Sequence, residues 1–168
     1  DWAEYQSKMH SNKIAITDYF LNKKISYKEL NSSACKIANF LQSKDIGHSD
    51  RIAILSKNHS IFFELQFACS KLGSIMVPLN WRLTANELSF ILNDCEPSLL
   101  IVDDCFETIA NQLRSLIPKI TIQVFNSEGK PSEFEKNINE CSSEFKKASL
   151  SLNDLIMIMY TSGTTGHP

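Results

Sequence analysis

The sequence predicts an α/β fold in which a parallel sheet is flanked by helices on both faces. Strand-like and helix-like patterns alternate at least three times between residues 51 and 125. The strand-like runs are apolar without interruption, and the connections between neighbouring elements are short. Uninterrupted apolar strands that alternate with helices are typical of parallel sheets buried on both faces.

The first fifty residues predict a short helix, a hairpin and a longer helix. Residues 1–12 carry apolar side chains at spacings of three and four, which predicts the short helix. Runs 14–16 and 25–27 flank a polar turn, which predicts the hairpin. Ser26 and Glu29 have the spacing of a capping box and therefore start the longer helix. Its buried stripe is expected to comprise Leu30, Ala34, Ile37, Ala38 and Leu41.

The alternating part predicts four strands, at residues 51–55, 74–79, 98–102 and 119–125. The helix after the first strand is expected to end at Gly73, which tolerates a left-handed backbone. Thr84 and Glu87 repeat the capping-box spacing at the start of the second helix. One of two adjacent acids, Asp103 or Asp104, is expected to cap the third helix, because carboxylates are favoured at helix N-termini.

Residues 126–151 are mostly polar and charged, and two interpretations stay open. One is a surface linker that leads back to the sheet. The other is an amphipathic helix within this stretch, because Phe134, Ile138, Cys141 and Phe145 recur at intervals of three and four.

Composition and charge narrow the class of function. The net charge is −2, from 17 basic and 19 acidic residues that are interspersed, so we expect no nucleic-acid partner. No apolar run is long enough for a transmembrane segment, and no export signal is apparent. The five cysteines form no C-x-x-C pair, which favours buried thiols and a cytoplasmic location. No His, Cys, Asp and Glu set has metal-ligand spacing.

The last fourteen residues combine an apolar run with a loop of unusual composition. Residues 155–160 are apolar and predict a buried strand. The loop behind them is rich in hydroxyls and glycine, which bring hydrogen-bond donors close to an oxyanion. We therefore predict a phosphate-binding loop at residues 160–168, although a plain turn at a strand end is the alternative. The residues expected to contact phosphate are Thr161, Ser162, Gly163, Thr164, Thr165 and Gly166.

The string from Tyr160 to Pro168 resembles the phosphate loop of the adenylate-forming (AMP-binding) enzymes. This superfamily comprises acyl-CoA synthetases, luciferases and peptide-synthetase adenylation domains. Residues 25–30, 50–55 and 72–80 are similar to further segments of the same family and occur in the family's order along the chain.

Small differences favour the acyl-CoA synthetase branch, with its fatty-acid and aryl CoA ligases. Residues 78–80 read Pro-Leu-Asn and residues 163–166 read Gly-Thr-Thr-Gly, and both strings are more similar to CoA ligases than to peptide-synthetase domains. The chain departs from the family pattern at Ser49, where Gly is usual. The Lys that normally follows the proline of the loop falls beyond residue 168.

The resemblance implies that residues 1–168 are the incomplete, N-terminal portion of an AMP-binding adenylation domain. The intact enzyme would be an ATP-dependent carboxylate–CoA ligase that forms acyl-AMP and then acyl-CoA. It would use ATP, Mg²⁺ and CoA on a fatty or aromatic carboxylic acid, which would place it in fatty acid metabolism. The loop would hold the β- and γ-phosphates of ATP.

In the family, the Mg-binding Glu, the acyl pocket and the catalytic Lys would lie beyond Pro168. We therefore expect no catalytic residue in this fragment, and no ligase activity from the fragment alone. Two other functions stay open at this point. One is a peptide-synthetase-type or acyl-carrier-protein-loading adenylation domain. The other, of a different class, is a non-catalytic phosphate-binding or scaffold domain.

Overall fold

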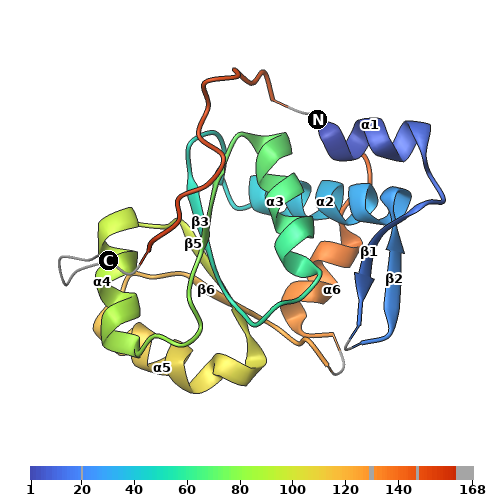
Figure 1. Ribbon diagram of the computed structural model, residues 1–168. Helices are drawn as coiled ribbons and strands as arrows, with labels where there is room; N and C mark the ends of the chain where they lie inside the picture. Colours follow the sequence, from blue (N-terminus) through green and yellow to red (C-terminus); the bar gives the residue numbers. More distant parts are fainter. Residues whose placement is uncertain (20, 129–130, 147, 162–168) are drawn as a thin grey trace.

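A computed structural model describes residues 1–19, 21–128, 131–146 and 148–161 of the protein. Helix α1 (Trp2–Met9) leads into an antiparallel hairpin of β1 (Ile14–Asp18) and β2 (Lys23–Ser26). The later elements are α2 (Tyr27–Gln42), β3 (Arg51–Leu55), α3 (Ile61–Leu72), β4 (Ile75–Pro78), α4 (Ala85–Cys95), β5 (Leu99–Asp103), the 3-10 helix η1 (Asp104–Phe106), α5 (Glu107–Leu116), β6 (Ile122–Phe125) and α6 (Glu133–Glu140) (Figure 1).

Four of the strands form one parallel sheet with the order β4-β3-β5-β6. Strand β3 lies in the middle, where Ile52 is opposite Met76 of β4 on one side and Leu99 of β5 on the other. The sheet confirms the α/β prediction, and each of the four strands overlaps the range expected from its apolar run.

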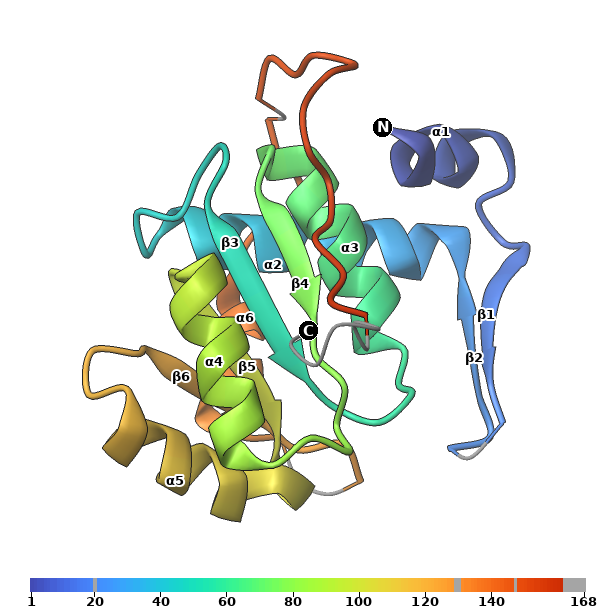
Figure 2. The same ribbon diagram turned by 60° about the vertical axis from the view of Figure 1, so that its left-hand side comes forward.

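Helices cover both faces of this sheet because its side chains alternate between two cores. Ile52 and Ile54 of β3 point into a core closed by α2, α3 and α6, which we call the α3-face core. Ala53 and Leu55 point the other way, into a core closed by α4 and α5, which we call the α4-face core. Figures 1 and 2 show the two helical layers on opposite sides of the strands. Strands buried on both faces have to be apolar throughout, which is the pattern of the sequence.

Both predicted capping boxes are present. At the start of α2, the backbone N–H of Glu29 donates to Ser26 Oγ at 3.3 Å, and the N–H of Ser26 donates to Glu29 Oε2 at 2.7 Å. At the start of α4, the corresponding distances between Thr84 and Glu87 are 3.4 and 2.8 Å. Each box satisfies two N–H groups that the helix itself leaves without a partner.

Part of the polar stretch at residues 126–151 is helical. Helix α6 starts with a third capping box, formed by Ser132 and Glu135, and it buries Phe134 and Ile138. The chain after α6 is irregular and is tied to α2, where the side-chain amide of Asn39 donates to two of its backbone carbonyls at 2.8 and 2.9 Å. The stretch is therefore helix first and surface connection afterwards.

Helix α1 is present as predicted, but its apolar side chains are largely exposed. Trp2 is 52% exposed and stacks on Phe67 of α3, with ring centroids 5.6 Å apart. The firmest attachment of α1 is an ion pair between the Asp1 carboxylate and the buried ammonium of Lys71, which also donates to Asn31 Oδ1 at 2.8 Å. Burial lowers the pKa of Lys71, because an ammonium group is less stable away from water.

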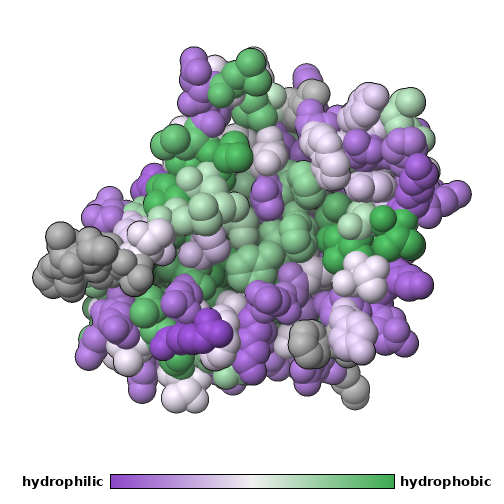
Figure 3. Space-filling model, in the orientation of Figure 1, coloured by the Kyte–Doolittle hydropathy of each residue, from purple (hydrophilic) through white to green (hydrophobic). Residues whose placement is uncertain are grey.

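Residues 155–161, which we call the lead-in segment, do not form the predicted buried strand. Leu155 and Met159 are 64% and 69% exposed, and the segment joins the sheet through one isolated parallel bridge, between Met157 and Met76 of β4. Figure 3 shows hydrophobic side chains along the course of this segment. An apolar run of six residues becomes a buried strand only where other chain covers both of its sides, and among the described residues β4 is the only strand beside this segment.

The backbone of β4 explains why the pairing is so short. Alternate residues of a parallel strand face the same neighbour, so Ser74, Met76 and Pro78 face the open edge of the sheet. The N–H of Ser74 already donates to the carbonyl of Cys69 at the end of α3, at 3.1 Å. Pro78 has no N–H. Of these three residues, only Met76 donates to the lead-in segment, through a 3.1 Å hydrogen bond to the carbonyl of Ile156.

The exposure of the lead-in segment predicts the effect of charged substitutions on stability. Leu155→Lys and Met159→Lys should each change the free energy of unfolding by no more than about 0.5 kcal/mol, because these side chains lie largely in solvent. The control Leu100→Ala, in the fully buried part of β5, should cost about 2–5 kcal/mol. Urea denaturation measures all three. A loss of several kcal/mol with either lysine would instead indicate a buried strand.

Candidate functional site

The structure describes the entry to the predicted phosphate loop. Of the residues expected to contact phosphate, Thr161 is described and is exposed. The other five lie outside the described residues: Ser162, Gly163, Thr164, Thr165 and Gly166. The geometry of the site is therefore the geometry of the lead-in segment, which is attached to the domain at three places.

The first attachment lies just before the lead-in segment and joins it to the loop after α2. His48 Nε2 lies 3.1 Å from Asp154 Oδ2, and His48 Nδ1 lies 2.9 Å from Ser49 Oγ. The same carboxylate accepts the N–H of Ser151 at 2.8 Å. The N–H of Ser151 and the histidine both lower the pKa of Asp154. Gly73, with φ of 78°, leaves room for this contact, because a Cβ there would lie 2.6 Å from His48 Cδ2.

The second attachment is the bridge at Met157. Beyond the hydrogen bond to Ile156, the carbonyl of Met76 accepts the N–H of Ile158 at 3.0 Å. The side chains then alternate as they do in a strand: Met157 packs against the α3-face core and Ile158 against the α4-face core. Pairing at a single residue, Met157, therefore determines which side chains of the segment point to each face of the sheet.

The third attachment is Tyr160, directly before Thr161. Its ring packs against the α4-face core, and its hydroxyl donates a short hydrogen bond to the carboxylate of Asp94 on α4. Burial and the neighbouring Asp94 raise the pKa of Tyr160 well above its usual value. The phenol therefore stays protonated and remains a donor throughout the neutral range.

The direction of the lead-in segment brings Thr161 to one end of the sheet. The segment runs parallel to β4, so it finishes beside the carboxyl end of that strand (Figure 2). Open α/β sheets bind their ligands in the space outside the carboxyl ends of the strands. Thr161 therefore lies at the carboxyl-terminal edge of the sheet, where a ligand is expected.

A polar hollow of about 680 Å³ opens at the same edge, near the ends of β3, β5 and β6. Lys57, Trp81 and Arg82 line it, with the Arg82 guanidinium 4.4 Å and the Lys57 ammonium 5.8 Å from the Trp81 ring. Both cations thus lie against an aromatic face, an arrangement that holds positive charge in place.

Sequence reasoning assigned Asp103 a capping role and missed its position at the centre of this edge. It does cap η1, where it accepts the N–H of Cys105 at 3.3 Å. Its carboxylate is also buried and accepts from Ser56 Oγ at 3.1 Å and Ser127 Oγ at 3.0 Å. These serines follow β3 and β6, so one carboxylate ties together the ends of three strands. The contacts of Asp103 with the two serines depend on which strand ends are neighbours in the sheet. No local sequence pattern reveals that order.

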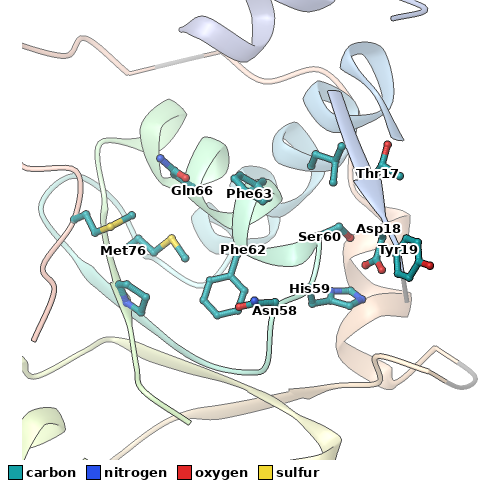
Figure 4. A pocket seen from close by; sticks show the side chains of 13 residues that line it. Thr17, Asp18, Tyr19, Asn58, His59, Ser60, Phe62, Phe63, Gln66 and Met76 are labelled. Carbon is teal, nitrogen blue, oxygen red and sulfur yellow. The ribbon is translucent and has the colours of Figure 1, made fainter. Parts of the chain in front are cut away.

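An apolar hollow of about 570 Å³ lies on the other side of β4, between the hairpin and α3 (Figure 4). Phe62, Phe63 and Met76 line it, and Met157 of the lead-in segment borders it. His59 also lines it, and its Nδ1 accepts the N–H of Ile61, the first residue of α3, at 3.1 Å. His59 is therefore engaged as a helix cap.

Within the described ranges, no three Asp, Glu, His or Cys side chains lie close enough together to hold a metal ion. No helix there has both the length and the apolar character needed to cross a membrane.

Comparison with known proteins identifies the family of the chain. The model of the family described as AMP-binding enzyme matches residues 3–168, nearly the whole chain. The chain belongs to the AMP-binding enzyme family. This membership confirms the family resemblance found in the sequence.

Relatives of this AMP-binding chain act with different thiol acceptors. It is 30% identical to a fatty acid–[acyl-carrier-protein] ligase of Streptomyces coeruleorubidus, over 86% of the chain and 27% of the relative. It is 28% identical to the indoleacetate–CoA ligase of Aromatoleum aromaticum, over 100% of the chain and 33% of the relative. The chain thus spans about a third of the length of these relatives.

A solved structure with the same fold is the inhibitor-bound N-terminal domain of FACL13 from Mycobacterium tuberculosis. The TM-score is 0.88 at 26% identity, and the match covers 99% of this chain and 41% of that structure. This similarity confirms that the AMP-binding chain has the fold of an N-terminal acyl-CoA synthetase region.

The contact between His48 and Asp154 predicts a pH-dependent attachment of the lead-in segment. The pKa of Asp154 is lowered in the folded chain, so its stabilisation is complete above the ordinary carboxyl pKa of 3.8 and is lost as the pH falls below that value. Hydrogen exchange at the N–H of Ile158 should show protection that declines between about pH 5 and about pH 2.

The variant Asp154→Asn should show lower protection of Ile158 with a flatter pH dependence. The control Glu140→Gln, at an exposed carboxylate on α6, should behave like the unmodified chain. Equal protection of Ile158 in the unmodified chain and in Asp154→Asn, at every pH, would contradict a role of this contact in holding the segment.

Proposed function

We propose that the complete protein carrying this chain is an ATP-dependent ligase that joins a carboxylic acid to the thiol of CoA through an acyl-AMP intermediate. The observation that carries the proposal is the string Tyr160 to Gly166 at the end of a segment that runs parallel to β4. The string offers the donors that a triphosphate requires, and Thr161, its first expected phosphate contact, lies at the edge where open α/β sheets bind ligands, in a chain of the AMP-binding family.

The proposed reaction has two displacements. A carboxylate oxygen of the acid attacks the α-phosphorus of ATP, the bond from that phosphorus to the bridging oxygen of the β-phosphate breaks, and pyrophosphate leaves. The sulfur of CoA then attacks the acyl carbon, its proton is lost, and AMP leaves with the electron pair of the acyl–oxygen bond. Pyrophosphate departure concentrates negative charge on the β- and γ-phosphates, so donors held around them lower the barrier of the first step.

The loop residues have a limited role in this scheme. The backbone N–H groups near Gly163 and Gly166 and the hydroxyls of Thr161, Ser162, Thr164 and Thr165 hold the β- and γ-phosphates. Mg²⁺ would neutralise part of the phosphate charge. The described residues offer no cluster of ligands for it, so we assign none of them to the metal.

The names of the relatives bear on the class of acid substrate and on the thiol acceptor. Ligases named for indoleacetate, ferulate and long-chain fatty acids are similar to this chain, which supports a fatty or aromatic acid as the substrate. The ligase that loads an acyl carrier protein favours a second candidate function, in which a carrier-protein thiol replaces CoA. The Pro-Leu-Asn string at residues 78–80 supports CoA.

We place the protein in the cytoplasm and in fatty acid metabolism. The five cysteines are all free, and Cys35, Cys69 and Cys95 are buried, which is the usual state of cysteines in a reducing compartment. Burial raises the pKa of Cys69 to about 12, so this thiol is inert at neutral pH.

Exchange of labelled pyrophosphate into ATP, measured on the complete protein with short, medium, long and aromatic acids, tests the proposal. We expect acid-dependent exchange that falls at least about ten-fold in Gly163→Ala and Gly166→Ala, because added side chains keep the backbone from the phosphates. The matched control is Gly47→Ala, where a Cβ meets nothing within 4 Å. A folded protein that binds ATP but exchanges with no acid would favour a non-catalytic phosphate-binding or scaffold domain instead.

Thioester assays separate the two acceptors. The complete protein should form acyl-CoA faster than it loads an acyl carrier protein, whereas the reverse order would favour a carrier-protein-loading or peptide-synthetase-type enzyme. The isolated 168-residue chain should form neither product, since it spans about a third of its relatives. Detectable thioester formation by the isolated chain would contradict this expectation.

A further inference from the structure

We propose that Tyr160 and Asp94 are positioning residues, and that their hydrogen bond fixes the point from which the phosphate loop leaves the sheet. The inference rests on the proposed function, because it concerns how the loop is presented to ATP. It goes beyond that function by giving a role to a helix, α4, that contributes nothing to the loop itself.

The place of Tyr160 in the chain suits it to position the loop. It directly precedes Thr161, the first residue expected to contact phosphate, so any movement of its backbone is passed on to the loop. Its side chain has two separate attachments: the ring packs against the α4-face core, and the hydroxyl donates to Asp94. The packing of the ring holds the side chain against the core, and the hydrogen bond to Asp94 fixes where the hydroxyl lies along α4.

Strand pairing does not hold this end of the segment in the usual way. After the bridge at Met157, the next residue of β4 that faces the segment is Pro78, which has no N–H to donate. Met159 is 69% exposed and adds little packing. The contact of Tyr160 with Asp94 therefore takes the place of the next rung of the ladder.

Helix α4 is itself held firmly at both ends. Its start is fixed by the capping box of Thr84 and Glu87. Its end is fixed by Arg51 of β3, whose guanidinium donates to the carbonyls of Cys95 at 2.8 Å and Glu96 at 2.7 Å. The helix that carries Asp94 is thus tied to the central strand of the sheet.

Asp94 stands at a position of α4 where a carboxylate is not favoured. A carboxylate in the last turn lies at the negative end of the helix dipole, and α4 has no basic residue in that turn to offset it. A residue that opposes the local electrostatics is expected to have a compensating role elsewhere. Accepting the Tyr160 hydroxyl is the role that the structure shows for it.

The test measures pyrophosphate exchange in the complete protein as a function of ATP and of the acid. Tyr160→Phe keeps the ring and removes the donor, and Asp94→Ala removes the acceptor. Each should raise the KM for ATP about three- to ten-fold, the loss expected for one hydrogen bond, while the KM for the acid stays within about two-fold. Asp94→Asn, whose amide oxygen still accepts, should restore most of the affinity for ATP.

The double variant separates positioning from general damage. If the two side chains act through one hydrogen bond, Tyr160→Phe combined with Asp94→Ala should be no worse than either single variant. The control on the same helix is Ser89→Ala, which removes a partly exposed hydroxyl that donates to the carbonyl of Asn86, and it should leave both KM values unchanged.

Three outcomes would overturn the assignment. One is a KM for ATP in Tyr160→Phe within two-fold of the unmodified protein. Another is an additive loss in the double variant. The third is an equal rise in the KM for the acid, which would indicate a general structural effect. Absence of exchange in the unmodified protein would overturn the proposed function, and this inference with it, so the two failures are distinguishable.

Discussion

Strand β4 faces the open side of the sheet with one N–H group left to pair, that of Met76. The neighbouring donor at Ser74 is used to end α3, and Pro78 has none. A sheet edge with few free N–H groups accepts little further strand, which protects the domain from pairing with other chains. Because β4 has so few free N–H groups, the lead-in segment lies along the sheet without forming a further strand of it.

Because backbone pairing is so limited, side chains hold the segment instead. Asp154 binds at the beginning, Met157 in the middle and Tyr160 at the end, each on a different part of the domain. The resulting attachment fixes the entry to the loop while leaving apolar side chains such as Leu155 in solvent. Contacts of this kind are weaker and more local than a strand ladder, so we expect the segment to open more readily than β3 or β5.

The sequence predicted the sheet and its helices well because local physics decides them. The capping boxes at Ser26 and Thr84 act over three residues, and strands such as β3 are apolar because both of their faces are buried. The prediction for residues 155–160 was wrong because burial depends on neighbours that an apolar run cannot specify. The roles of Asp94 and Asp103 stayed hidden for a related reason: their partners are distant in the sequence and meet them only in the folded sheet.

The central claim is that this domain presents its Ser/Thr/Gly loop to the terminal phosphates of ATP. Backbone amide NMR during titration with nucleotide tests it most directly. The account predicts that Mg·ATP shifts the amide signals of Thr161 to Gly166, and that AMP, which lacks the β- and γ-phosphates, leaves them in place. Equal shifts with ATP and AMP, or ATP shifts confined to residues outside the loop, would contradict it.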